Sequence, residues 1–248
     1  SMFFYSCVDR FFGNFISSQG NGSIKGGKVF TVPGTFCLGD GTNAAGTLTR
    51  WIRDTLYRTE RDREADGGEN AYAVMAREAA QVPPGCEGLM LLPYIYGERS
   101  PIQDPEACGL LFGLRGIHTR AHINRAALEA VGYSTLQHLK LFEEMGVKAS
   151  SIITAGGGTQ NLTWMQIVCD MAGIPITIPE HYQCSAYGDA MMAAVGCGRL
   201  ESFSALRAAL PPGKALVPNP ENHALYERNY PLFRDLYLTN RPLMHRGT

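Results

Sequence analysis

The chain contains 248 residues, with 22 Lys and Arg against 23 Asp and Glu and a formal net charge of −1 at pH 7. This length suffices for one large domain or two small ones with a hydrophobic core. The balanced charge lacks the basic excess of a general nucleic-acid-binding protein, so no nucleic acid is expected as a partner. No apolar run approaches the roughly 20 residues of a membrane-spanning helix, so no membrane is expected as a partner either.

The cysteines indicate a reducing compartment. They number seven, lie far apart and include no Cys-x-x-Cys pair. This pattern favours free thiols over a disulfide framework or a zinc site, so a cytoplasmic location is expected. His118 and His122 have the spacing of zinc ligands on a helix, but the residues between them include Arg120 and no Glu. We therefore expect no metal site there.

The first part of the chain predicts a loop, a strand and then helices. Gly, Ser and Asn dominate residues 18–28, which indicates a turn or loop, and residues 28–32 predict a strand that stops at Pro33. Apolar residues recur at helical spacing in residues 47–63 and in residues 71–82. The second of these helices is expected to end where two prolines and a glycine follow it.

The remainder of the chain alternates strands and helices. Apolar runs at residues 88–95 and 109–114 predict strands, and residues 118–145 predict the longest helix. Then the expected order is strand, glycines, helix, strand and helix, over residues 150–155, 156–158, 161–171, 174–179 and 185–196. Residues 221–240, interrupted by Pro231, predict a pair of helices. The alternation favours an α/β fold with an at least partly parallel sheet and helices packed on it.

Three consecutive glycines, Gly156, Gly157 and Gly158, separate a predicted strand from a predicted helix. Without side chains, this backbone can be approached closely, and the first N–H groups of the helix lie at the positive end of its dipole. Three glycines in a row exceed what a single turn with positive φ requires. The motif therefore predicts phosphate binding.

A dinucleotide site is an alternative interpretation of the same glycines. The G-x-G-x-x-G fingerprint would use Gly156 and Gly158, with Glu180 in the place of the acid that binds a ribose about 20 residues further on. Asn161 occupies the position of the third glycine, where the fingerprint needs close packing of helix and strand. An NAD-dependent oxidoreductase thus stays as the alternative.

The segment GLLFGLRGIHTRAHINRAALE, residues 109–129, resembles the second signature of the FGGY family of carbohydrate kinases. It shows the small and apolar positions, the seven-residue spacer and the Ala-rich helix that ends in an acid. Four other segments resemble the family and follow its order: GTNAAGTLTRWIRD, LPYIYGERSP, AGGGTQNLTWMQIVCDMAG and SAYGDAMMAA. The resemblance covers most of residues 30–240.

The resemblance implies an α/β, ribonuclease-H-like domain of the actin and hexokinase type, with a mixed sheet flanked by helices. It implies the C-terminal half of a two-domain kinase, with residues 29–248 as the nucleotide-binding domain and residues 1–28 as an uncertain N-terminal segment. The base aspartate of the family precedes this half, so no catalytic residue is assigned in this chain. A non-catalytic nucleotide-binding module on the same fold is a second alternative.

The resemblance also implies an ATP site. By position, Gly46 corresponds to a glycine near the β- and γ-phosphates, Gly157 to the one under the α-phosphate, between Gly156 and Gly158, and Asn161 to a residue near the adenine.

The sugar site is less defined by the sequence. Two interpretations of Glu98 and Arg99 are open: they border the sugar cleft, or they pair with each other at a strand end. The expected cofactors are ATP and Mg²⁺, and the expected substrate is a pentulose, such as xylulose, or a related sugar. The chain's own N-terminal domain is the expected partner, and a homodimer is left open.

Overall fold

The computed structural model describes residues 3–7, 15–16, 28–29, 36–37, 41–180, 184–202, 205 and 213–246. The predicted loop at residues 18–28 and most of the predicted strand at residues 28–32 therefore lie outside the described residues, apart from positions 28 and 29. Within the described part, no helix combines the length and apolar character needed to cross a membrane.

One mixed sheet runs through the molecule, with strand order β3-β4-β2-β1-β7-β8-β9. The strands are β1 (Phe3–Cys7), β2 (Phe15–Ile16), β3 (Lys28–Val29), β4 (Phe36–Cys37), β7 (Ser151–Ala155), β8 (Ile176–Ile178) and β9 (Lys214–Leu216). β7 and β8 are parallel, whereas β1 pairs with β7 and β9 pairs with β8 in antiparallel fashion. The sheet is thus mixed, as the family resemblance implies, and partly parallel, as the alternation of strands and helices predicts.

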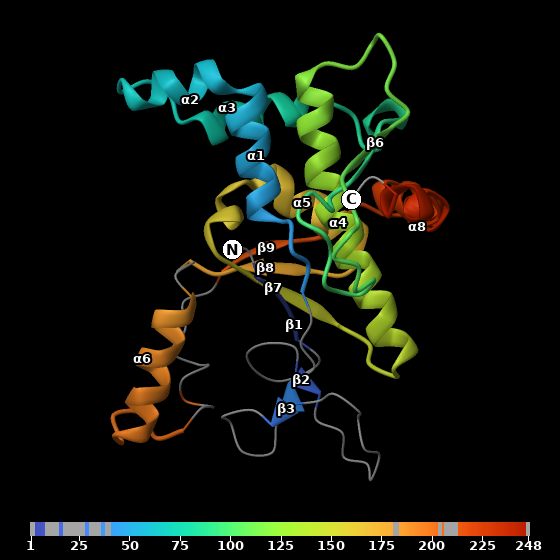
Figure 1. Cartoon of the computed structure of the whole chain (residues 1–248). Coiled ribbons are helices and arrows are strands. Elements are labelled where there is room, and N and C mark those ends of the chain that lie inside the picture. The colour runs from blue at the N-terminus through green and yellow to red at the C-terminus, as the bar shows by residue number, and fades with distance from the viewer. Residues whose placement is uncertain are drawn as a thin grey trace.

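Helices lie on both sides of the β7–β9 strands (Figure 1). They are α1 (Gly46–Leu56), α2 (Arg58–Ala65), α3 (Ala71–Gln81), α4 (Arg120–Glu144), α5 (Leu162–Ala172), α6 (Cys184–Gly196) and α8 (Pro220–Met244). In Figure 1, α1, α3 and α5 lie above these strands and α6 lies below them. A small antiparallel sheet of β5 (Met90–Leu92) and β6 (Leu110–Phe112) completes the described fold.

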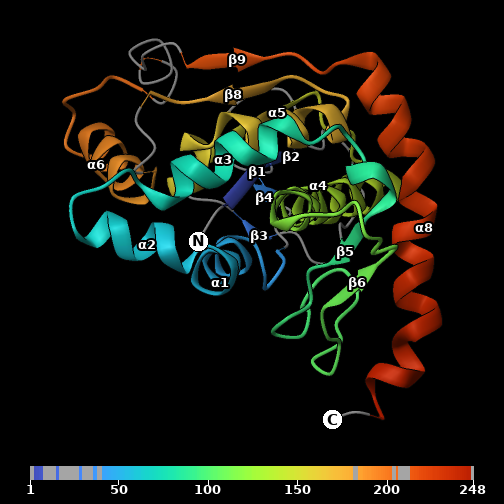
Figure 2. The same cartoon turned by 90° about the horizontal axis from the view of Figure 1, so that it is seen from above.

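Much of the core comes from α4, α5 and α8. Figure 2 shows α8 running along one edge of the molecule, beside β5 and the end of α4. Leu128 of α4, Met165 of α5 and Phe233 of α8 are almost fully buried, and burying such a side chain contributes about 1.5–3 kcal/mol. A Cβ atom on Gly132 of α4 would collide with the Met171 side chain of α5. The glycine therefore permits the close approach of these two helices.

Two predicted helices differ from the structure. The helix expected over residues 47–63 is divided at Tyr57 into α1 and α2. Tyr57 is fully buried, its hydroxyl donates to Glu78, and the Arg120 guanidinium covers its ring. These contacts with α3 and α4 hold Tyr57 outside helical geometry, so tertiary packing outweighs the local helical pattern.

The helix pair expected over residues 221–240 is wrong: α8 is one helix of 25 residues that contains Pro231. An internal proline costs a helix about 3 kcal/mol. Tyr226, Phe233 and Tyr237 flank it and are buried, and this burial offsets the loss of a backbone hydrogen bond. β9, a three-residue strand at one edge of the sheet, was not predicted from the sequence.

Candidate functional site

The glycine turn connects β7 to α5 through a short 3-10 helix at Gly157–Gln160. Gly156 has φ 90° and ψ 175°, a conformation that is almost restricted to glycine. The Thr159 hydroxyl donates to the Gly156 carbonyl at 2.8 Å and closes the turn. A Cβ atom placed on Gly157 would have nothing within 4 Å among the described residues other than its chain neighbours. The protein itself thus leaves open space beside the Gly157 backbone.

Asn161 begins α5. Its side-chain oxygen accepts a hydrogen bond from the Trp164 N–H at 3.0 Å, which is the usual contact of an N-cap residue. The sequence predicted a helix that starts at this residue, and α5 starts directly after it. This capping hydrogen bond gives Asn161 a structural role that does not depend on a ligand.

The second predicted glycine, Gly46, is the first residue of α1. No side chain caps this helix within the described residues, and a Cβ atom on Gly46 would meet nothing within 4 Å. Ala44 and Ala45 just before it are buried in the core. α1 therefore presents an open N-terminus, which favours an anion because of the helix dipole.

Glu98 and Arg99 lie against the loop that leads into α1. The Glu98 side chain is buried, and it accepts hydrogen bonds from the Thr42 hydroxyl and the Asn43 N–H. Arg99 is exposed, and its Nε donates to the Gly41 carbonyl at 3.2 Å. The predicted residues thus fall into two groups: Gly156, Gly157, Gly158 and Asn161 around the start of α5, and Gly46, Glu98 and Arg99 around the start of α1.

The acid that ends the signature segment is part of the core. Glu129 Oε1 accepts hydrogen bonds from the Gly85 N–H, from Arg125 Nε at 2.9 Å and from the Tyr226 hydroxyl at 2.9 Å. Burial raises the pKa of Glu129, although the Arg125 guanidinium opposes this change. Since removing one partner of a buried ion pair is strongly destabilising, we interpret this acid as a structural link between α4, α8 and the turn after α3.

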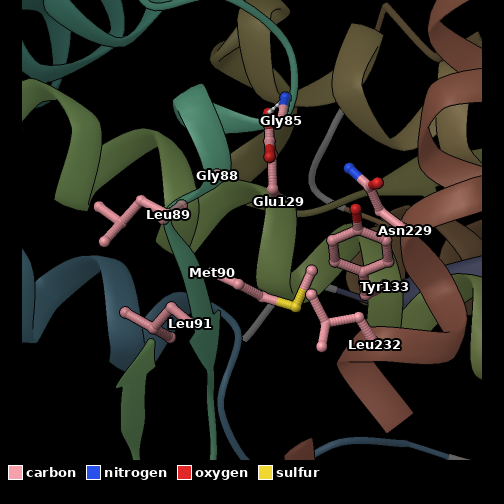
Figure 3. A pocket seen from close by; sticks show the side chains of 10 residues that line it. Gly85, Gly88, Leu89, Met90, Leu91, Glu129, Tyr133, Asn229 and Leu232 are labelled. Carbon is pink, nitrogen blue, oxygen red and sulfur yellow. Dashed lines mark hydrogen bonds between the residues drawn. The ribbon is translucent and has the colours of Figure 1, made fainter. Parts of the chain in front are cut away.

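A small pocket lies beside this network. Figure 3 shows Met90, Tyr133, Asn229 and Leu232 around it, with the hydrogen bond between Gly85 and Glu129 at its edge. None of the glycines predicted to approach ATP lines it. It is therefore a gap in the packing between α4, α8 and β5, distinct from the predicted nucleotide site.

His118 and His122 have structural contacts. His122 forms a capping box with Thr119 at the start of α4, and its Nε2 lies 2.9 Å from Glu87 Oε2. The His118 ring nitrogen Nδ1 accepts from the Arg115 N–H at 2.9 Å. Within the described residues, no group of three or more His, Cys, Asp or Glu side chains is arranged to hold a metal ion.

The comparisons with known proteins give the family. Residues 22–197 match the C-terminal domain of the FGGY family of carbohydrate kinases. A crystal structure of xylulose kinase from Rhodospirillum rubrum superposes with a TM-score of 0.74 and 32% identity, over 86% of this chain and 42% of that one. The fold is therefore the α/β, actin- and hexokinase-like fold of these kinases. The chain belongs to the FGGY family, as a C-terminal domain of the type found in xylulose kinases and gluconokinases.

Two curated relatives agree with this assignment. The xylulose kinase of Staphylococcus epidermidis is 30% identical over 214 residues, which is 86% of this chain and 41% of the relative. The gluconokinase of Bacillus licheniformis is 31% identical over 214 residues, 85% of this chain and 42% of the relative. The chain thus spans about two fifths of the length of the curated relatives it matches.

Sequence reasoning missed the residues that hold the loop before α1. Thr42 and Asn43 contact Glu98 across 56 and 55 residues of chain, and Asp104 contacts Tyr237 across 133. Such separations leave no local periodicity or motif to detect. The segments around Thr42 and Glu98, GTNAAGTLTRWIRD and LPYIYGERSP, were noted because they resemble the family, but nothing in the sequence indicated that they are in contact.

Proposed function

We propose that this chain is the ATP-binding half of a sugar kinase that phosphorylates a hydroxyl of a pentulose or a related sugar. The names of its relatives, xylulose kinase and gluconokinase, support this substrate class. The share of those relatives that the chain covers supports a further N-terminal domain, which would carry the catalytic base and most of the sugar site. The same proposal assigns residues 29–248 to the nucleotide-binding domain and leaves a homodimer open.

The observation that carries the proposal is the open space at Gly157. The Gly156 turn brings the backbone of residues 157 and 158 to the start of α5. Among the described residues, leaving out its chain neighbours, nothing lies within 4 Å of the position where a Gly157 side chain would begin. A phosphate can approach this backbone, where the helix dipole favours negative charge. Gly156, Gly157 and Gly158 are proposed to contact the α-phosphate, with Asn161 near the adenine.

The start of α1 is the proposed place of the β- and γ-phosphates. Gly46 leaves room for them, and the first N–H groups of an uncapped helix can donate to phosphate oxygens. When bound, ATP supplies the phosphoryl group and Mg²⁺ neutralises charge on its oxygens. The residues of this chain bind and orient the nucleotide. Closure of the N-terminal domain would exclude water that could otherwise accept the phosphoryl group.

Calorimetric titration with ATP in the presence of magnesium tests the proposal. We expect weak binding by the wild-type chain and at least a tenfold loss in Gly157→Val, because the side chain would fill the proposed phosphate site. The matched control is Gly116→Val, since Gly116 also has nothing within 4 Å of its would-be Cβ. Binding of ATP that Gly157→Val leaves unchanged would contradict the proposed site, and binding of NAD in place of ATP would contradict the proposed function.

A coupled assay for sugar phosphorylation tests whether the catalytic base lies in the N-terminal domain and the ATP site in this chain. We expect the 248-residue chain alone to transfer no phosphoryl group to xylulose or gluconate, because the base is assigned to the N-terminal domain. Turnover by this chain would contradict that assignment. Adding the N-terminal half from the same reading frame is expected to give turnover; nucleotide binding with no turnover after that addition would favour a non-catalytic module. A cytoplasmic location remains a prediction.

A further inference from the structure

The Glu98 side chain lies at the base of a tight hairpin. The backbones of Glu98 and Asp104 exchange two hydrogen bonds of 2.8 Å, which close the hairpin. Glu98 is 2% exposed. A buried carboxylate loses the solvation of its charge, so it needs donors from the protein.

Those donors come largely from the loop before α1. Glu98 Oε1 accepts from the Asn43 N–H at 2.7 Å and from the Arg99 N–H at 2.8 Å. The Thr42 hydroxyl donates to Oε2. Hydrogen bonds to an ionised acceptor are about twice as strong as neutral ones. This carboxylate therefore ties residues 42 and 43 to the hairpin, three residues before α1 begins at Gly46.

The same carboxylate is a poor direct ligand for phosphate or sugar. Its oxygens already accept these three hydrogen bonds, and a negative charge would repel a phosphate brought into contact with it. What it can do is hold the backbone. Arg99 adds to the same connection, because its Nε donates to the Gly41 carbonyl.

Asp104, which faces Glu98 across the base of the hairpin, is attached to the end of α8. Asp104 is 3% exposed and accepts from the Tyr237 hydroxyl and from His245 Nε2, each at 2.8 Å. Arg241 Nε lies 3.5 Å from the same carboxylate. The hairpin thus connects the C-terminal end of α8 to the loop before α1, with one buried carboxylate at each contact.

We propose that Glu98 is a positioning residue for the phosphates of ATP: its buried carboxylate sets the position of residues 42 and 43 and thereby the N-terminus of α1. Asp104 fixes the hairpin from which Glu98 acts. This inference rests on the proposed function, because it assumes that the start of α1 receives the β- and γ-phosphates.

The variant Glu98→Gln tests the role, since it keeps the size of the side chain but removes the charge and replaces one acceptor by a donor. Calorimetry with ATP, ADP and adenosine separates phosphate contacts from base contacts. We expect the Kd for ATP to rise at least tenfold and the Kd for adenosine to change less than twofold. Hydrogen exchange of the amides at residues 42–48 is expected to become faster.

Two further variants keep the test specific. Thr42→Val removes one donor with little change of shape and is expected to weaken ATP binding less than Glu98→Gln. In the double variant the two effects are expected to be non-additive, because both act on one contact. Glu144→Gln, at an exposed position near the end of α4, is the control and is expected to bind ATP like the wild type.

The outcomes separate this inference from the proposed function. Absence of ATP binding by the wild-type chain would overturn the proposed function, and this inference with it. ATP binding by the wild type that Glu98→Gln leaves unchanged would overturn this inference alone. Equal losses for ATP and adenosine would also overturn it, because they would indicate general damage to the domain.

Discussion

The two helix N-termini predicted to approach ATP are held in opposite ways. The turn before α5 is held by its own neighbours: Gly156, Thr159, Asn161 and Trp164 make its contacts within nine positions of sequence. The loop before α1 is held by Glu98, 55 and 56 residues away. The first is a local structure that a motif can encode, whereas the second exists only when two distant segments have packed together. The affinity for a ligand that contacts both helix N-termini therefore depends on the local turn before α5 and on the long-range contacts of Glu98.

The largest effect is expected from breaking the remote attachment at Asp104. Asp104→Ala leaves the buried Tyr237 hydroxyl and the half-buried His245 ring without their acceptor, and an unpaired buried group costs about 1–3 kcal/mol. We expect the free energy of unfolding in urea to fall by about 3 kcal/mol. Tyr237→Phe, which removes one donor only, is the graded comparison and is expected to cost about 1 kcal/mol. A loss below that of Tyr237→Phe would show that the attachment contributes little.

A smaller effect is expected from straining the local turn. Gly156→Ala places a Cβ atom on a residue with φ 90° and ψ 175°, and strain of this kind costs about 1–3 kcal/mol. Gly157→Ala is the matched comparison, because its Cβ would have open space and its effect is expected within about 0.5 kcal/mol. Urea denaturation measures both. Equal effects would mean that the two glycines do not differ in structural role.

The cap of α5 is expected to contribute about 1 kcal/mol. Asn161→Ala removes the acceptor of the Trp164 N–H, and loss of an N-cap side chain typically costs this amount. Asn161→Asp keeps an acceptor and should unfold like the wild type. Comparing their adenosine affinities separates the cap from the proposed adenine contact: if Asn161→Asp is as stable as the wild type but binds adenosine more weakly, the side chain has both roles.

The smallest effect is a difference in acid sensitivity between the two regions. Burial alone would raise the pKa of Asp104, but the hydrogen bonds from His245 and Tyr237 outweigh it and hold the pKa below its usual value. A carboxyl with a lowered folded pKa stabilises the fold above its unfolded pKa of about 4, and this contribution is lost as the pH falls through the folded pKa. In the described part of the chain, the side-chain hydrogen bonds of the turn before α5 come from Thr159 and Asn161, which are not ionisable.

We therefore expect the unfolding free energy of the wild type to fall more steeply below about pH 5 than that of Asp104→Asn. Urea denaturation at a series of pH values down to about pH 2 measures the two slopes. Asn161→Ala, which changes only the local turn, should keep the wild-type slope. Parallel curves for the wild type and Asp104→Asn would contradict the role of this carboxyl.

Much of the fold followed from local patterns. The helices α3, α4 and α5 and the strand β7 lie where periodicity and β-branched runs predicted them, and Asn161 caps α5. The errors occurred where packing opposes the local pattern. Tyr57 leaves the helix because its ring and hydroxyl are used by neighbouring elements, and Pro231 stays inside α8 because the residues around it are buried.

The sequence by itself determined the order of the elements from α3 to α6, the glycine turn and the capped start of α5, because each depends on residues that are neighbours in the chain. It also carried the motifs that place the chain in the FGGY family. The tertiary structure alone decided that Glu98 holds the loop before α1 and that Asp104 holds the hairpin to α8. A buried carboxylate takes whichever donors the packed chain brings to it, and those donors are separated from it by tens of residues of sequence.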